Sequence, residues 1–223
     1  DSTGDWSSDV CSSDLPTQPS DLFDALIKQV IDIKAINDLG ETALHIALRY
    51  NKLNTKSDLA AIKSLVKANG GLRIADCAGE TVLHRAIRNT DITVEILSLL
   101  VDEGIDVNAA DEKGLTALHY AVELRSTAIV QFLLDQGADV AAVDLQQASM
   151  LHHAAACVKL SVSKVIPLLV KEGLDIKAVN KQGRTPLHVA AQSGSKNGVK
   201  ALVERYSTDI NVTDKNEDTA LHF

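Results

Sequence analysis

The chain has 223 residues, of which 45% are hydrophobic and only 3% aromatic, and its formal net charge is −8. So few aromatic residues disfavour a β-sandwich or barrel, whose strands are rich in Tyr, Phe and Val. The acidic balance argues against a nucleic-acid partner, because phosphate binding needs clustered Lys and Arg. No run approaches the ~18 apolar residues of a membrane span, so we expect no membrane partner either.

Residues 1–19 are predicted to be a disordered tail. The first fifteen carry four Asp, five Ser and one Thr, without a basic residue or any periodicity. This composition is typical of disorder and lacks the basic start and apolar stretch of a signal peptide. The segment from Asp5 to Leu15 also matches the conceptual translation of a common sequencing adapter, so we interpret the tail as an artefact. We expect the folded domain to span residues 20–223.

The first predicted helix runs from Asp21 to Gln29, where Leu22, Phe23, Leu26 and Ile27 have helical spacing. After it, one block recurs six times along the chain. The copies are Thr42-Ala-Leu-His45-Ile-Ala47, Thr81-Val-Leu-His84-Arg-Ala86, Thr116-Ala-Leu-His119-Tyr-Ala121, Ser149-Met-Leu-His152-His-Ala154, Thr185-Pro-Leu-His188-Val-Ala190 and Thr219-Ala-Leu-His222. Successive block histidines are 39, 35, 33, 36 and 34 residues apart. Such a period is typical of stacked supersecondary units.

Each copy is predicted to be a turn followed by two antiparallel helices. An Asp or Asn precedes the Thr or Ser by five residues, and Gly follows that Asp or Asn by three in four copies, which is turn chemistry. The Thr or Ser suits a helix N-cap. A second apolar-periodic segment follows, as in Ile96, Leu99 and Leu100. Pro167 is expected near the first turn of its helix, where a missing N–H costs little.

The block Thr-x-Leu-His-x-Ala resembles the ankyrin-repeat family from about residue 20 to the last residue. The resemblance implies an all-α solenoid of about five full repeats, with partial units at both ends. In two copies Gln147 and Glu217 stand where the others have the turn Gly, and Ser149 replaces Thr. Because the sixth copy stops at Phe223, we expect the chain to be a fragment whose ends are sticky, with Leu221 and Phe223 exposed.

The repeated histidines are expected to serve architecture. Neighbouring helices lie ~8–10 Å apart, whereas zinc ligands must all lie within ~2.0–2.3 Å of one ion. We expect each imidazole to bond the turn backbone and its own Thr, and the resemblance implies that it bridges adjacent repeats. His153 is interpreted as a surface or contact residue, and no acid completes a nucleophilic site with Cys157 in the sequence. We predict no catalytic, cofactor-binding or metal-binding residues.

Binding by the family's concave face and turn tips is what the resemblance implies. Along the concave face, a group of basic residues is followed by a group of apolar and aromatic residues. We take these two groups as the candidate patch, because Arg and Tyr are favoured interface anchors. The partner-binding candidates are Arg49, Tyr50, Arg85, Arg88, Asn89, Tyr120, Glu123, Leu124 and His153. The alternative, that this stretch is ordinary solvated helix surface, stays open.

The function predicted from the sequence is a non-enzymatic protein–protein interaction scaffold that needs no cofactor and is a monomer apart from its sticky ends. Its location is predicted to be cytoplasmic or otherwise intracellular, since the three cysteines show no pairing pattern. One alternative is the substrate-docking arm of a larger enzyme whose catalytic domain lies outside this sequence. Another is a membrane-skeleton or channel-type tether with a much longer array.

Overall fold

The computed structural model describes residues 32–50, 56–68, 70–124, 127–157 and 162–223. The predicted tail, residues 1–19, and the predicted helix from Asp21 to Gln29 lie outside these ranges. The described residues form ten α-helices and no β-strand, as the all-α prediction requires. No described helix has the length and apolar character needed to cross a membrane.

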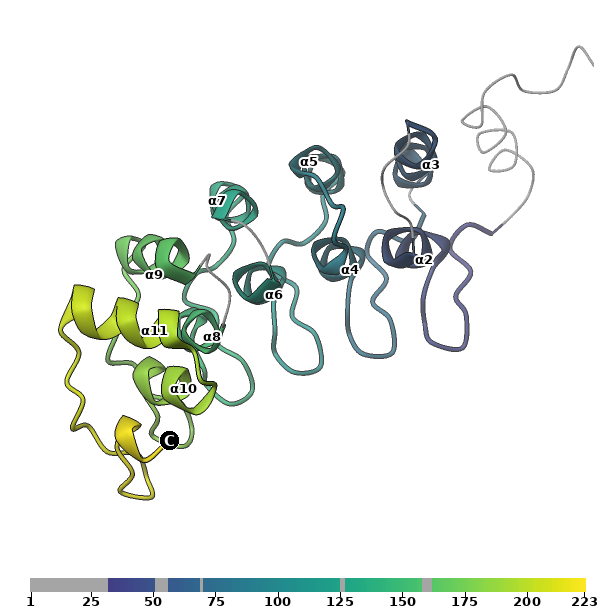
Figure 1. The fold of residues 1–223 in the computed structure, drawn as a ribbon. Coiled ribbons are helices and arrows are strands. Elements are labelled where there is room, and N and C mark those ends of the chain that lie inside the picture. The colour runs from purple at the N-terminus through teal and green to yellow at the C-terminus, as the bar shows by residue number, and fades with distance from the viewer. Residues whose placement is uncertain (1–31, 51–55, 69, 125–126, 158–161) are drawn as a thin grey trace, which may run out of the picture.

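The helices come in pairs, each preceded by a hairpin loop (Figure 1). The pairs are α2 (Ala43–Tyr50) with α3 (Lys56–Lys67), α4 (Val82–Arg88) with α5 (Val94–Asp102), α6 (Ala117–Leu124) with α7 (Thr127–Asp135), and α8 (Met150–Ala156) with α9 (Val162–Lys171). In the fifth unit α10 (Pro186–Gln192) pairs with α11 (Lys196–Lys200), which continues as the π-helical turn η1 (Ala201–Arg205). A sixth hairpin leads into the 3₁₀ turn η2 (Ala220–His222).

Stacking of the pairs gives two rows of helices, with the hairpins projecting to one side (Figure 1). The first helices pack in the order α2, α4, α6, α8 and α10, and α3, α5, α7 and α9 form the second row. The block leucines point into this stack and are almost fully buried: Leu44, Leu83, Leu118, Leu151 and Leu187. The core is therefore one continuous apolar layer shared between neighbours, as expected of a repeat array.

Local sequence chemistry sets the start of each first helix. Thr81, Ser149 and Thr185 occupy N-cap positions with extended backbone, and each shares a capping box with the histidine three residues later. Antiparallel backbone bridges that include the cap residue close four of the hairpins, as between Ala75 and Thr81. The helix start and the hairpin are thus fixed by the same few residues.

Two hairpins keep the same turn without glycine. The turn glycine of the second unit, Gly79, has a φ of +74°, and a Cβ there would lie 2.8 Å from the backbone nitrogen of Glu112. Gln147 and Glu217 occupy the equivalent positions with φ of 56° and 66°. Their left-handed backbone costs on the order of 1–2 kcal/mol for an L-residue. Packing between adjacent hairpins therefore imposes the turn even where the side chain disfavours it.

The prediction for Pro167 was wrong. It is the sixth residue of α9, which begins at Val162, and so lies inside the helix. The helix starts three residues before Val165, where the apolar periodicity begins. Because proline has no N–H, the turn loses one backbone hydrogen bond at this point.

Candidate functional site

The turn Asp or Asn of each unit organises its hairpin. In Asp76, Asp111 and Asp144, Oδ1 accepts hydrogen bonds from the backbone N–H groups two and four residues later, at 2.8–2.9 Å. The Oδ1 atoms of Asn37 and Asn180 do the same at 2.9–3.1 Å. An Asx turn of this kind holds the hairpin in one conformation.

In three of the four turn Asp residues the other carboxylate oxygen bonds a side chain nine residues later, on the outward face of the first helix, whereas Oδ2 of Asp214 accepts from Arg184 in the preceding hairpin. Arg85 donates to Asp76 at 2.6 Å, Tyr120 donates to Asp111 at 2.7 Å, and a ring nitrogen of His153 lies 3.1 Å from Asp144. We call each such bond a hairpin tie. Where the turn residue is Asn37 or Asn180, the ninth residue is apolar, Ile46 or Val189. Three of the nine predicted binding residues are therefore bonded to the turn residues of their own hairpins.

Buried carboxylates surround the three arginines of the predicted patch. Arg85 also lies 3.0 Å from Glu80 and 3.6 Å from Glu41. Arg49 pairs with Glu41 at 2.7 Å and Arg88 with Glu80 at 2.6 Å. The side chain of Glu41 is fully buried and that of Glu80 is 7% exposed. This cluster joins the first two units and neutralises the positive charge that the sequence suggested would face a partner.

The same cluster shifts the pKa of Asp76, the turn residue of the second unit. Burial raises the pKa of Asp76, but the hydrogen bond from Arg85 and those from the turn N–H groups outweigh burial and hold the pKa below its usual range. Because charge-assisted bonds of this kind are stronger than neutral ones, Arg85 holds its hairpin firmly.

Four further candidates differ in their surroundings. Asn89 is buried and donates to the carbonyl of Leu48 in the preceding unit at 2.6 Å, so it joins two repeats. Arg88 keeps 45% of its side chain exposed and lies 5.5 Å from the centre of the Tyr120 ring. Leu124 is 36% exposed at the end of α6. The side chain of Tyr50 lies outside what the structure describes.

His153 has two acidic partners that sequence reasoning did not find. Its Nδ1 lies 2.7 Å from Oε1 of Glu123 on α6, while its Nε2 reaches Asp144 in its own hairpin. Burial lowers the pKa of His153, but these two carboxylates outweigh burial and raise the pKa above its usual value. The thiol of Cys157 donates to the backbone carbonyl of Glu123 at 3.2 Å. The nine-residue offset could have revealed Asp144, whereas Glu123 is 30 residues away and required the stacking geometry.

The block histidines bond as predicted. In the first unit the Thr42 N–H and hydroxyl lie 3.3 and 2.9 Å from Nδ1 of His45, so that nitrogen is an acceptor and Nε2 carries the proton. Nε2 then donates to the carbonyl of Glu80 in the next hairpin at 3.2 Å. His84, His152 and His188 make the equivalent bridge at 2.8–3.2 Å. These bridges join the first, second, fourth and fifth units each to the hairpin that follows.

His119 is the exception. Among the described residues its buried Nε2 has no hydrogen-bond partner. Its ring instead meets that of His153 edge to face, with centroids 5.0 Å apart. Burial, followed by the charge of His153, lowers the pKa of His119 to about 4. This histidine is therefore neutral at neutral pH, whereas the pKa of its neighbour His153 is shifted in the opposite direction.

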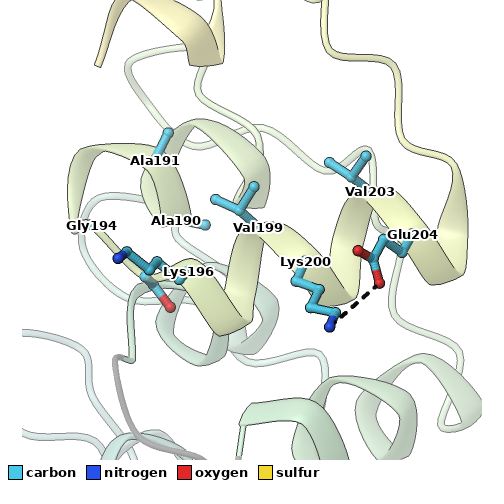
Figure 2. Close-up of a pocket in the computed structure, with 9 residues that line it drawn as sticks. Ala190, Ala191, Gly194, Lys196, Val199, Lys200, Val203 and Glu204 are labelled. Carbon is cyan, nitrogen blue, oxygen red and sulfur yellow. Dashed lines mark ion pairs between the residues drawn. The ribbon is translucent and has the colours of Figure 1, made fainter.

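Two hollows lie near the last full unit. One, of about 310 Å³, lies between the hairpins and first helices of the fourth and fifth units. The other, of about 520 Å³, is the end hollow, formed on α10, α11 and η1 by Ala190, Ala191, Val199 and Val203 (Figure 2). In the preceding unit the corresponding face is covered, because α10 packs on α8 and α11 packs on α8 and α9.

The described residues do not form a metal centre: no group of three His, Cys, Asp or Glu side chains within them is arranged to hold an ion. The site is instead a surface made of hairpins and first helices. Its polar side chains are mostly engaged within the stack, and its exposed apolar side chains include Leu39, Leu124 and Leu145.

Comparison with known proteins relates the chain to a family of repeat proteins. The family described as ankyrin repeats (3 copies) matches residues 17–111, 54–144 and 151–223. An ankyrin repeat domain-containing protein, SAT10, of Stachybotrys chartarum is 35% identical over 101 residues. Neurogenic locus notch homolog protein 1 of Homo sapiens is 34% identical over 119 residues, and a putative ankyrin repeat protein of Rickettsia bellii is 33% identical over 102.

These alignments cover 45%, 39% and 45% of this chain, and 5%, 4% and 52% of the three relatives respectively. The chain therefore spans less than two thirds of the length of each. Ankyrin repeats are in general protein–protein interaction modules. With three family matches that together cover most of the chain, six block copies and the stacked helix pairs in agreement, the chain belongs to the ankyrin-repeat family.

Proposed function

We propose that this chain is a non-enzymatic scaffold that binds another protein through its concave face and hairpin tips. The supporting observation is that one set of side chains maintains the fold while another set is exposed to solvent. Residues of the block and the hairpin ties are buried or bonded within the stack, whereas Leu39, Leu124 and Leu145 are 36–57% exposed on the hairpins and first helices. Exposed apolar side chains on a rigid polar surface are typical of interaction sites.

We propose a shorter set of direct contacts than the sequence suggested. Arg85, Tyr120 and Asn89 act within the fold, so a partner meets the surface that they shape. Leu124 and the exposed part of Arg88 are proposed as direct contacts, together with the tips at Leu39 and Leu145. An intracellular location is proposed as well, because the two described cysteines, Cys77 and Cys157, are free thiols.

Affinity capture with chemical cross-linking tests this proposal. Leu124→Glu and Leu145→Glu should each reduce recovery of the captured protein at least tenfold without changing helicity. Val94→Glu is the matched control, because Val94 is 40% exposed on α5 in the second row of helices. Equal loss with all three variants, or loss with none, would exclude the concave face and tips as the binding surface.

The chain is further proposed to be a monomer with an adhesive end at the end hollow. Val199 and Val203 border this hollow beside the exposed Lys200–Glu204 pair (Figure 2). Sedimentation at increasing concentration should show weak self-association that Val199→Glu/Val203→Glu removes. Association unaffected by this variant would place the adhesive surface elsewhere.

A further inference from the structure

The 310 Å³ hollow between the fourth and fifth units is here named the amide hollow, and it exists because one hairpin tie is missing. In the second, third and fourth units Arg85, Tyr120 or His153 spans from the first helix to its own hairpin. The fifth unit has Val189 at that position, and Val189 lines the hollow. A valine is too short and apolar to bond the hairpin, so space stays open between hairpin and helix.

The wall facing this space carries an amide donor without an acceptor. Oδ1 of Asn180 accepts hydrogen bonds from the N–H groups of Gln182 and Arg184, so its Nδ2 takes the place of the Oδ2 that faces the helix in the Asp units. In the first unit Nδ2 of Asn37 donates to Glu41 at 3.0 Å. The corresponding residue here is Arg184, which has no acceptor. Within the described residues, the Asn180 amide donates to no group.

Further amides line the same hollow. Gln192 uses its Oε1 to accept from Arg184 at 2.9 Å, which leaves its own NH₂ group for a ligand. Gln146 and Gln182 lie at the rim, 3.4 Å apart through their side-chain amides. The hollow therefore offers several N–H donors beside a smaller number of acceptors.

The basic side chains of Arg184 and His153 at this hollow already have acidic partners. Arg184 pairs with the fully buried carboxylate of Asp214 at 3.0 Å. His153 lies between Glu123 and Asp144. A carboxylate ligand would find no free cation and would approach these two acids, while a cationic ligand would face the amide N–H donors. A desolvated charge without a partner is costly, whereas a neutral group that completes hydrogen bonds is not.

We propose that the amide hollow binds an uncharged amide side chain, Asn or Gln, from an extended segment of the partner protein. The ligand carbonyl accepts from Asn180 and Gln192, and its NH₂ group donates to the acceptors at the rim. A volume of about 310 Å³ is at the small end of the ~300–1,000 Å³ range of ligand pockets and has room for an amide side chain together with the backbone beside it. This inference rests on the proposed interaction function and adds to it the chemistry of one anchor residue.

A random 12-residue peptide display library, selected on this chain, tests the inference. The comparison protein is the double variant Asn180→Asp/Val189→Tyr. It introduces the Asp and Tyr pair of the third unit, so that a hairpin tie closes the hollow. Selected peptides should contain an Asn or Gln whose replacement by Asp or Glu weakens binding at least tenfold. They should lose binding to the double variant to the same extent.

Asn180→Asp alone is the sharper variant, because Asp keeps both hairpin bonds through Oδ1 and replaces only the free donor with an acceptor. It should weaken binding of amide-containing peptides at least tenfold. Gln131→Glu on α7 makes a similar amide-to-acid change away from the hollow and should have no effect. Urea unfolding of each variant establishes that the fold is retained.

The outcomes separate the two proposals. Peptides that bind without a required Asn or Gln, or that bind Asn180→Asp as well as the wild type, would overturn the amide inference. In that case Leu124→Glu and Leu145→Glu should still abolish binding, and the proposed interaction function would stand. Peptides insensitive to all of these variants would overturn both proposals.

Discussion

The hydroxyl of Tyr120 donates a 2.7 Å hydrogen bond to Oδ2 of Asp111, and this bond links the outward face of α6 to the hairpin of the same unit. Both side chains are largely removed from solvent. Burial, and the hydrogen bond to Asp111 after it, raise the pKa of Tyr120 well above its usual value. The hydroxyl therefore stays protonated and remains a donor throughout the physiological pH range.

Removing this hydroxyl should destabilise the chain through the acceptor left behind. Tyr120→Phe leaves the buried Oδ2 of Asp111 without its donor, and we expect a loss of about 1–3 kcal/mol in the free energy of unfolding. Tyr120→Phe/Asp111→Asn replaces the buried carboxylate with a neutral amide and gives an Asn and apolar pairing like that of Asn180 with Val189. It should recover at least half of that loss in urea unfolding, and a double variant less stable than both single variants would contradict the tie.

Arg85 should matter more for stability than any exposed charge. Arg85→Met leaves Asp76 and Glu80 without their shared cation, and breaking a buried ion pair in this way costs about 3–5 kcal/mol. Lys63→Met is the matched control, because Lys63 pairs with Glu95 at the surface, where such pairs contribute ~0–1 kcal/mol. Chemical denaturation measures both, and equal effects would show that the cluster is not a structural element.

The repeat architecture could be predicted from the sequence, because the constraints that set it are local and recur. The cap at Thr81, the block leucine Leu83 and the turn at Gly79 lie within five residues of each other and act on the backbone. A fixed spacing in the sequence therefore corresponds to a fixed geometry.

The chemistry of the concave face could be predicted only in part. Helical spacing places Arg85 and Tyr120 on the outward faces of their helices, but their bonds to Asp76 and Asp111 require knowing how far the hairpin folds back over its helix. Contacts between units, such as that of Glu123 with His153, depend on the rotation of one helix pair against the next, which the packing of side chains determines. No local pattern in the sequence predicts that rotation.

Acid should destabilise the fold through the block histidines. Burial is the main cause that lowers the pKa of His45, His84, His119 and His152 below 6.5. Since the unfolded value is ~6.5, their contribution to stability is complete above pH 6.5 and is lost as the pH falls. For His119, with its pKa of about 4, the loss approaches about 3 kcal/mol at ~1.36 kcal/mol per unit.

Urea unfolding between pH 7.5 and 4.5 measures this acid effect. This pH range stays above 3.8, the pKa of Asp76 in the unfolded chain. At lower pH, protonation of Asp76 would also reduce stability, because the pKa of this carboxyl is lowered in the folded state. Carbon-detected NMR should show that the His119 ring does not titrate between pH 7 and 5. Stability that is unchanged from pH 7.5 to 5.5 would contradict the assignment of these histidines as neutral structural bridges.

His153 should respond to pH in the opposite direction. The groups that face it are Glu123 and His119 from α6 and Asp144 from its own hairpin. The two carboxylates raise its pKa, so its stabilising contribution is complete below pH 6.5 and is lost as the pH rises through the raised value. Its ring carbons should therefore titrate above pH 6.5 in NMR, and Glu123→Gln should lower that midpoint.

His153→Gln separates this charge effect from simple loss of a contact. The difference in the free energy of unfolding between wild type and His153→Gln should be largest below pH 6.5 and should shrink as the pH rises toward 9. Tyr120→Phe, which removes the equivalent tie one unit earlier, is the control, because the phenol stays protonated over this range and its difference should not change. A His153→Gln difference that is equally independent of pH would mean that the ring is neutral, and that Glu123 and Asp144 hold it by geometry rather than by charge.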